Sequence, residues 1–122
     1  LPQGMQDKRA EKILEISQFQ SQIVNNALQI TFNITNLSKD KLAGHIFVLH
    51  YQGNKIQIYP SNALDPETNL LKYSMGESFF TARFRPSQAN FDNTAKIGFI
   101  KLIIFSRMGD LIFVQKYPIG EN

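Results

Sequence analysis

A strict two-residue alternation over residues 28–35 constrains this chain more than any other feature of its sequence. The apolar positions are Leu28, Ile30, Phe32 and Ile34, and a polar residue follows each of them. Period two with one apolar side is the pattern of a β-strand that is buried on one face only. Asn25 and Asn26 before it, and the polar residues 36–41 after it, are typical of turns and loops, so a strand is predicted over residues 27–37.

Residues 42–59 are predicted as a β-hairpin. The pair Gly53-Asn54 separates two apolar runs, and a glycine in first position suits a two-residue type II′ turn. Such a turn determines which residues lie opposite each other across the two strands. The predicted pairs, all on the face assigned to the core, are Tyr51 with Ile56 and Leu49 with Ile58, with Phe47 near Pro60.

Residues 78–85 also alternate and are predicted as a strand that ends at Arg85-Pro86. Thr81, Arg83 and Arg85 fall on one side, and Phe80, Ala82 and Phe84 fall on the other. Two arginines on one strand face make a candidate site for an anion or an anionic glycan, because a guanidinium binds phosphate and carboxylate oxygens well. The alternative is a solvated edge strand that its charges protect from aggregation.

The last hairpin, residues 97–117, is apolar on both faces near its turn. Its predicted pairs are Ile104 with Phe113 and Ile100 with Tyr117 on the core face, and Phe105 with Ile112, Ile103 with Val114 and Lys101 with Lys116 on the other face. Lysines directly opposite each other are unfavourable in a dry site, so that end of the face is expected to be wet. The four apolar residues beside them, Ile103, Phe105, Ile112 and Val114, are a candidate surface for a partner protein or for self-association. Alternatively, the N-terminal strand or the long connection over residues 60–77 covers them.

About seven short strands and no convincing internal helix favour an all-β antiparallel two-sheet sandwich with an immunoglobulin-like arrangement. A small barrel is the alternative. The 122 residues suit one domain, placed at residues 12–122, with residues 1–11 as a tail or linker that is expected to fray. Residues 90–96 are predicted as a loop, and residues 70–73 are a candidate short strand.

No catalytic constellation is visible. His45 and His50 are an odd number of residues apart on one strand, so they point to opposite faces and cannot share a metal ion. There is no cysteine, and the acidic residues fall mostly in predicted loops. We therefore expect a protein that is not an enzyme, with no metal and no cofactor.

Neither nucleic acid nor a membrane is an expected partner of this chain. The net charge of +3 is spread along the sequence, and the aromatic residues beside Arg83 and Arg85 alternate to the other strand face. No apolar run approaches the roughly 20 residues that cross a bilayer. Membrane contact is expected only through a segment upstream of residue 1.

Residues 28–122 resemble the C-terminal β-sandwich of a group of uncharacterised bacterial envelope proteins that have an N-terminal membrane helix and a coiled coil. The segments that carry the resemblance are residues 30–36, 44–48, 78–80 with 83–85, and 105–114. The resemblance implies an interaction or scaffold domain on the periplasmic side of the cell envelope, without catalytic residues. The chain departs from this pattern in its long connection over residues 60–77.

Overall fold

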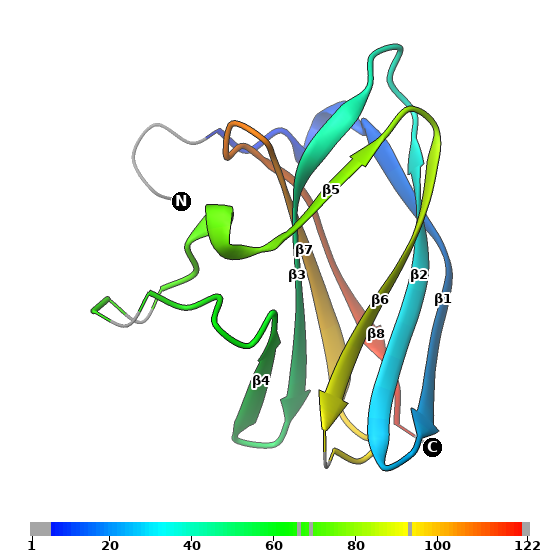
Figure 1. The fold of residues 1–122 in the computed structure, drawn as a ribbon, viewed down its shortest axis with the longest axis vertical. Helices are drawn as coiled ribbons and strands as arrows, with labels where there is room; N and C mark the ends of the chain where they lie inside the picture. Colours follow the sequence, from blue (N-terminus) through cyan, green and yellow to red (C-terminus); the bar gives the residue numbers. More distant parts are fainter. Residues whose placement is uncertain (1–5, 66, 69, 93, 121–122) are drawn as a thin grey trace.

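Two antiparallel β-sheets pack face to face in this protein (Figure 1). The computed structural model describes residues 6–65, 67–68, 70–92 and 94–120. In that part of the chain, eight strands form one sheet of three and one sheet of five. The prediction of an all-β two-sheet sandwich is confirmed.

The three-stranded sheet has the order β1-β2-β6. Its strands are β1 at Leu14–Val24, β2 at Ala27–Asn36 and β6 at Phe84–Asp92. The alternating segment is the central strand, and its four apolar side chains are at most 2% exposed. Asn25 and Asn26, with φ of 51° and 65°, make the predicted turn between β1 and β2.

The five-stranded sheet has the order β4-β3-β7-β8, with β5 also paired to β3. Its strands are β3 at Leu42–Gln52, β4 at Lys55–Tyr59, β5 at Glu77–Thr81, β7 at Phe99–Ser106 and β8 at Leu111–Pro118. β5 and β4 share one edge of β3: β5 pairs with residues 42–46 and β4 with residues 48–52. The predicted hairpin register is confirmed, because Tyr51 lies opposite Ile56 and Leu49 opposite Ile58.

The predicted core face of β3 is wrong. Ile46 and Val48 face the other sheet in the main core, whereas Phe47 and Leu49 point to the outer side of the five-stranded sheet. Both sets are buried, because β3 is a central strand with cover on both faces. A strand that is apolar on both sides gives no signal about which side meets the other sheet.

The outer side of the five-stranded sheet carries a second apolar cluster, called here the outer cluster. Its buried members are Phe47, Leu49, Ala63, Ile103, Phe105 and Leu111. The chain between β4 and β5 forms a long connection, whose described residues are 60–65, 67–68 and 70–76 (Figure 1). Ala63, Leu71 and Tyr73 of this connection pack on the cluster. Residues 70–73 are not a strand: Leu71 forms an isolated bridge with Leu64, and Tyr73 starts the short 3-10 helix η2, Tyr73–Met75.

The single strand predicted over residues 78–85 is two strands in two different sheets. β5 ends at Thr81, the chain crosses between the sheets at Ala82 and Arg83, and β6 starts at Phe84. β6 continues through Pro86 to Asp92, so the predicted stop at Pro86 and the start of the loop at residue 90 are also wrong. Proline is tolerated because β6 is an edge strand, where one N–H of every two has no ladder partner to lose.

The described part of the N-terminal segment is attached to the sandwich rather than frayed. Residues 1–5 of the predicted tail lie outside the described residues. Asp7 forms a parallel bridge with Leu111, the Lys8 N–H donates to the Leu111 carbonyl at 2.8 Å, and the Leu111 N–H donates to the Gln6 carbonyl at 2.9 Å. The short helix η1, Arg9–Glu11, then carries the chain across to β1 in the other sheet.

Candidate functional site

The predicted partner surface is buried within the chain. Ile103, Phe105 and Ile112 are 8%, 7% and 3% exposed, and Val114 is half-buried. The prediction of an exposed patch is therefore wrong, and one of its two alternatives holds: the connection after β4 covers Ile103, Phe105 and Val114.

Ile112 is separated from the other three residues by a β-bulge in β8. Ile104 lies opposite Phe113 as predicted, but Phe105 lies opposite Leu111 instead of Ile112. The extra residue turns Ile112 into the main core next to Phe113, and Leu111 takes its place in the outer cluster. The predicted pair of Phe105 and Ile112 is wrong for this reason.

The far end of the same face is open, as the opposed lysines predict. Lys101 lies opposite Lys116, and Lys116 is exposed. The Lys116 ammonium lies 5.0 Å from the centre of the Phe99 ring, and Phe99 stacks on Tyr51 with ring centres 4.6 Å apart. The Lys116 ammonium therefore rests near the face of an aromatic ring while its side chain stays exposed to water.

Arg83 and Arg85 do not form one anion site. Arg83 is exposed in the crossing between β5 and β6, whereas Arg85 points inward from β6. The Arg85 guanidinium donates to the Ser87 hydroxyl at 2.6 Å and lies 3.5 Å from the Glu77 carboxylate. A strand break between the two arginines removes the alternation that would have aligned them.

Arg85 belongs instead to a polar network that links the two sheets on their β5–β6 side. The Tyr59 hydroxyl donates to Glu77 Oε2 at 2.6 Å, and Glu77 Oε1 accepts from Arg85. This hydrogen bond to Glu77, followed by burial, raises the pKa of Tyr59 to about 12. Glu77 and Arg85 are thus committed to a structural contact.

The two histidines lie on opposite faces, as predicted. His45 is on the outer side of the five-stranded sheet, 5.8 Å from Tyr73 between ring centres and 3.5 Å from the Ser78 hydroxyl. His50 is 1% exposed between the sheets, and its Nε2 lies 2.7 Å from the Ile97 carbonyl oxygen. Because a carbonyl only accepts, His50 carries its hydrogen on Nε2, and its buried Nδ1 has no partner among the described residues.

A groove that the sequence did not predict runs between β8 and β1, the terminal strands of the two sheets. It has a volume of about 440 Å³ and is called here the edge groove. Its apolar lining consists of Leu14, Ile16, Leu37, Ile112, Phe113 and Val114. Arg9, Lys12 and Glu15 stand at its rim, and Arg9 is paired with Asp7 at 2.6 Å. The groove is thus apolar inside and close to neutral at its rim.

The two ends of the edge groove are closed by different means. At one end, a β-bulge in β1 between Ser17 and Gln20 aims Phe19 at Tyr117 of β8, and the rings stack 3.9 Å apart. Burial at this contact raises the pKa of Tyr117 to about 12. At the other end lies the N-terminal segment, which the ion pair between Lys8 and Asp110 holds at 3.0 Å. That pair lowers the pKa of Asp110 and raises the pKa of Lys8.

Between these ends the outer edge of β8 is open. Among the described residues, Leu111 is the last position of this edge whose N–H and C=O bond to another segment there. Alternate residues beyond it direct their N–H and C=O groups away from the sheet, because β7 occupies only one side of β8. An apolar groove beside an open strand edge offers both side-chain and main-chain contacts to an extended peptide.

In the described ranges, no helix is long and apolar enough to span a membrane, and no three His, Asp or Glu side chains gather as metal ligands. No protein family, no curated protein sequence and no solved structure matches this chain.

Proposed function

We propose that this domain is a non-enzymatic binding module that takes up an extended segment of a partner protein in the edge groove. The observation that carries the proposal is the coincidence of an apolar groove with an open strand edge. In β-augmentation, main-chain hydrogen bonds hold the added strand, and its alternate side chains enter pockets.

The N-terminal segment of the chain supports the choice of occupant. Residues 6–8 already lie beside β8, where Asp7 forms an isolated parallel bridge with Leu111, so this edge accepts main-chain hydrogen bonds from an extended segment. The chain then turns through η1 and crosses to the other sheet, so no described segment hydrogen-bonds its main chain to the outer edge of residues 112–115. A bound peptide continues the line that residues 6–8 begin.

The chemistry of the groove indicates which peptides fit. Six apolar side chains line it, so the occupant carries apolar side chains at every second position, about 6–7 Å apart along an extended chain. Each main-chain hydrogen bond contributes about 0.5–1.5 kcal/mol. A few such bonds and two buried side chains, at about 1.5–3 kcal/mol each, sum to roughly 5–10 kcal/mol before ordering costs, so we expect binding no tighter than micromolar.

The absence of catalysis is part of the proposal, and the structural use of the polar groups supports it. Glu77 and Arg85 are held in the network with Tyr59, and His50 is enclosed between the sheets. Asp7 and Asp110 are engaged with Arg9 and Lys8. These groups are therefore committed to structural contacts and are not available to an active site.

We also propose that the domain is immunoglobulin-like and belongs to a bacterial envelope protein. The orders β1-β2-β6 and β4-β3-β7-β8 support the first point, since they match the A-B-E and C′-C-F-G orders of immunoglobulin sandwiches. The fifth strand pairs with β3 instead of joining the first sheet. The resemblance described above supports the second point, and fractionation of cells that express the full-length gene product tests it.

The binding proposal is tested with peptides selected from a random library on the immobilised domain. We expect selected peptides with alternating apolar residues and micromolar affinity, measured by fluorescence anisotropy. Leu37→Asp, in the edge groove, should weaken binding at least about tenfold, because it puts a charge into an apolar site. Leu37 is 52% exposed, so the substitution leaves the fold intact.

Ile56→Asp is the matched control. Ile56 is 53% exposed on β4, away from the groove, and its replacement should leave binding unchanged. Equal losses in both variants, or peptides that bind Leu37→Asp as well as wild type, would contradict the proposal.

A further inference from the structure

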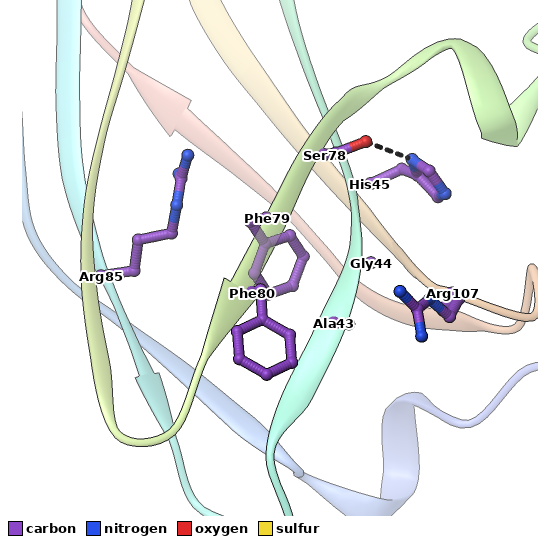
Figure 2. A pocket seen from close by; sticks show the side chains of 8 residues that line it. All are labelled: Ala43, Gly44, His45, Ser78, Phe79, Phe80, Arg85 and Arg107. Atoms are coloured by element: carbon purple, nitrogen blue, oxygen red, sulfur yellow. Dashed lines mark hydrogen bonds between the residues drawn. The ribbon is translucent and has the colours of Figure 1, made fainter.

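A small hollow lies beside β5, the start of β3 and the turn from β7 to β8. Its volume is about 290 Å³. Figure 2 shows Ala43 and Gly44 on β3 between Phe80 of β5 and Arg107 of the turn. Ser78 and His45 lie at its end, joined by the contact between the hydroxyl and Nδ1.

The floor of the hollow is low because its residues are small. A Cβ atom at Gly44 would collide with the carbonyl oxygen of Phe105 on the neighbouring strand, so only glycine fits there. The Arg107 N–H donates to the Ala43 carbonyl at 3.0 Å, which ties the β7–β8 turn to the floor. The Arg107 side chain is thereby held beside the hollow without being used in the tie.

Two of the three cations around the hollow, Arg107 and Lys41, have no acidic partner within ion-pair distance in the described part of the chain. The Lys41 ammonium lies 5.7 Å from the centre of the Phe80 ring at the rim. Arg85, the other arginine at the hollow, stands on β6 beyond β5 and is paired with Glu77 (Figure 2).

Phe80 adds a flat apolar wall to this basic site. Its ring is 60% exposed, unlike that of Phe79, which is 5% exposed in the core. A ligand ring can stack on Phe80 while its anionic group reaches the guanidinium and the ammonium.

We propose that the hollow binds a small phosphomonoester carried on a flat ring. Arg107 offers two parallel N–H donors to the phosphate, Lys41 adds a point charge, and the Ser78 hydroxyl and the His45 ring supply further polar contacts. Phe80 stacks on the ring. The hollow and the edge groove share no lining residue. A test of phosphate binding in the hollow is therefore independent of a test of peptide binding in the groove.

Phenyl phosphate, inorganic phosphate and phenol are the probes, titrated into the intact domain and followed by two-dimensional NMR. We expect phenyl phosphate to bind at least about fivefold more tightly than either of the other two, because only it satisfies both the ring and the charges. The shifted amides should be those of residues 43–45, 78–80 and 107. Adenosine monophosphate in place of phenyl phosphate shows whether the ring is that of a nucleotide or a simple aryl group.

Three variants assign the contacts. Arg107→Ala should weaken phenyl phosphate about tenfold or more, as loss of a charged hydrogen bond does. Phe80→Ala should abolish the preference over inorganic phosphate and leave inorganic phosphate binding as it was. Arg83→Ala removes an exposed arginine outside the hollow and should change neither affinity.

The proposal is overturned if Arg83→Ala weakens binding as much as Arg107→Ala, since this would show nonspecific attraction by the basic chain. Phenyl phosphate shifts at residues away from the hollow, or no preference for phenyl over inorganic phosphate, would overturn it as well.

Discussion

The outer faces of the two sheets avoid exposing a large apolar surface to water in different ways. On the three-stranded sheet, most outward side chains are polar, and some amides bond to one another, such as Gln22 to Gln29 at 2.9 Å and Asn33 to Gln18 at 2.8 Å. This face needs no cover. On the five-stranded sheet, Phe47 and Phe105 meet edge to face at 5.8 Å, and a whole connection is laid over them.

The difference follows from position in the sandwich and from composition. β2 alternates strictly, so one face is apolar and the other faces water. β3 and β7 are apolar on both faces, and they lie side by side in the middle of their sheet. A doubly apolar pair in a two-layer fold has only one other sheet to pack on, so a third layer must come from a loop. The length of the connection between β4 and β5 is explained by this requirement.

The largest effect that tests this comparison is expected at Phe47, which is fully buried in the outer cluster. Phe47→Ala should lower the free energy of unfolding by about 3–5 kcal/mol, because it leaves a large cavity under the connection. Urea unfolding followed by circular dichroism measures it. A loss below about 1 kcal/mol would mean that this outer face is a surface and not a second core.

A smaller effect is expected from the cover itself. Tyr73→Ala removes a half-buried ring from the outer cluster and should cost about 1–2 kcal/mol. It also uncovers Phe105, so the variant should self-associate at concentrations where the wild type has its normal sedimentation coefficient. Lys72→Ala, at the exposed neighbouring position, is the control and should change neither property. Unchanged sedimentation of Tyr73→Ala would show that other residues of the connection suffice as cover.

The polar network between the sheets predicts a pH effect at high pH. The pKa of Tyr59 rises from 10.0 to about 12 because its hydroxyl donates to Glu77, so folding favours the neutral phenol. Its contribution to stability is complete below pH 10 and is lost as the pH rises through about 12. Glu77→Gln should move the ionisation of Tyr59 back toward 10, seen by ultraviolet titration against a Tyr59→Phe reference. An unchanged titration in Glu77→Gln would mean that burial, not the hydrogen bond, dominates.

The smallest effect is expected on the polar face. Gln20 is exposed in β1, so Gln20→Ala should change the free energy of unfolding by no more than about 0.5 kcal/mol. Urea unfolding measures this change, with Phe47→Ala unfolded under the same conditions for comparison. A loss comparable to that of Phe47→Ala would remove the distinction between the two faces.

Much of the local structure could be predicted, and the misses have identifiable causes. β6 was missed beyond Pro86, although Ser87, Ala89 and Phe91 continue a period-two pattern with buried side chains. Pro86 predicts a strand end, but an edge strand such as β6 tolerates proline, so periodicity is the better guide there. The shift at Phe105 was missed because a β-bulge adds a residue without changing composition.

The sequence predicted the candidate sites less well than it predicted the strands. Arg83 and Arg85 were placed together by an alternation that the chain breaks when it crosses between the sheets. No sequence pattern predicts the edge groove, because its walls come from residues near 14, 37 and 113, which are brought together only by the folded sandwich. Phe80 and Arg107 are likewise far apart in the chain and meet through β3.

The sequence by itself determined which of the main segments are extended and where the clearest turns lie. Period two marks the strands, and Gly53, with φ of 59°, makes the turn that pairs Tyr51 with Ile56, because side-chain alternation and turn geometry act over a few residues. Only the tertiary structure decided what each face touches. The four apolar residues of the last hairpin needed cover in any fold, but whether a partner or the chain's own connection supplies it depends on contacts between distant segments. In this structure the connection between β4 and β5 covers the outer cluster. No described strand pairs with the outer edge of β8.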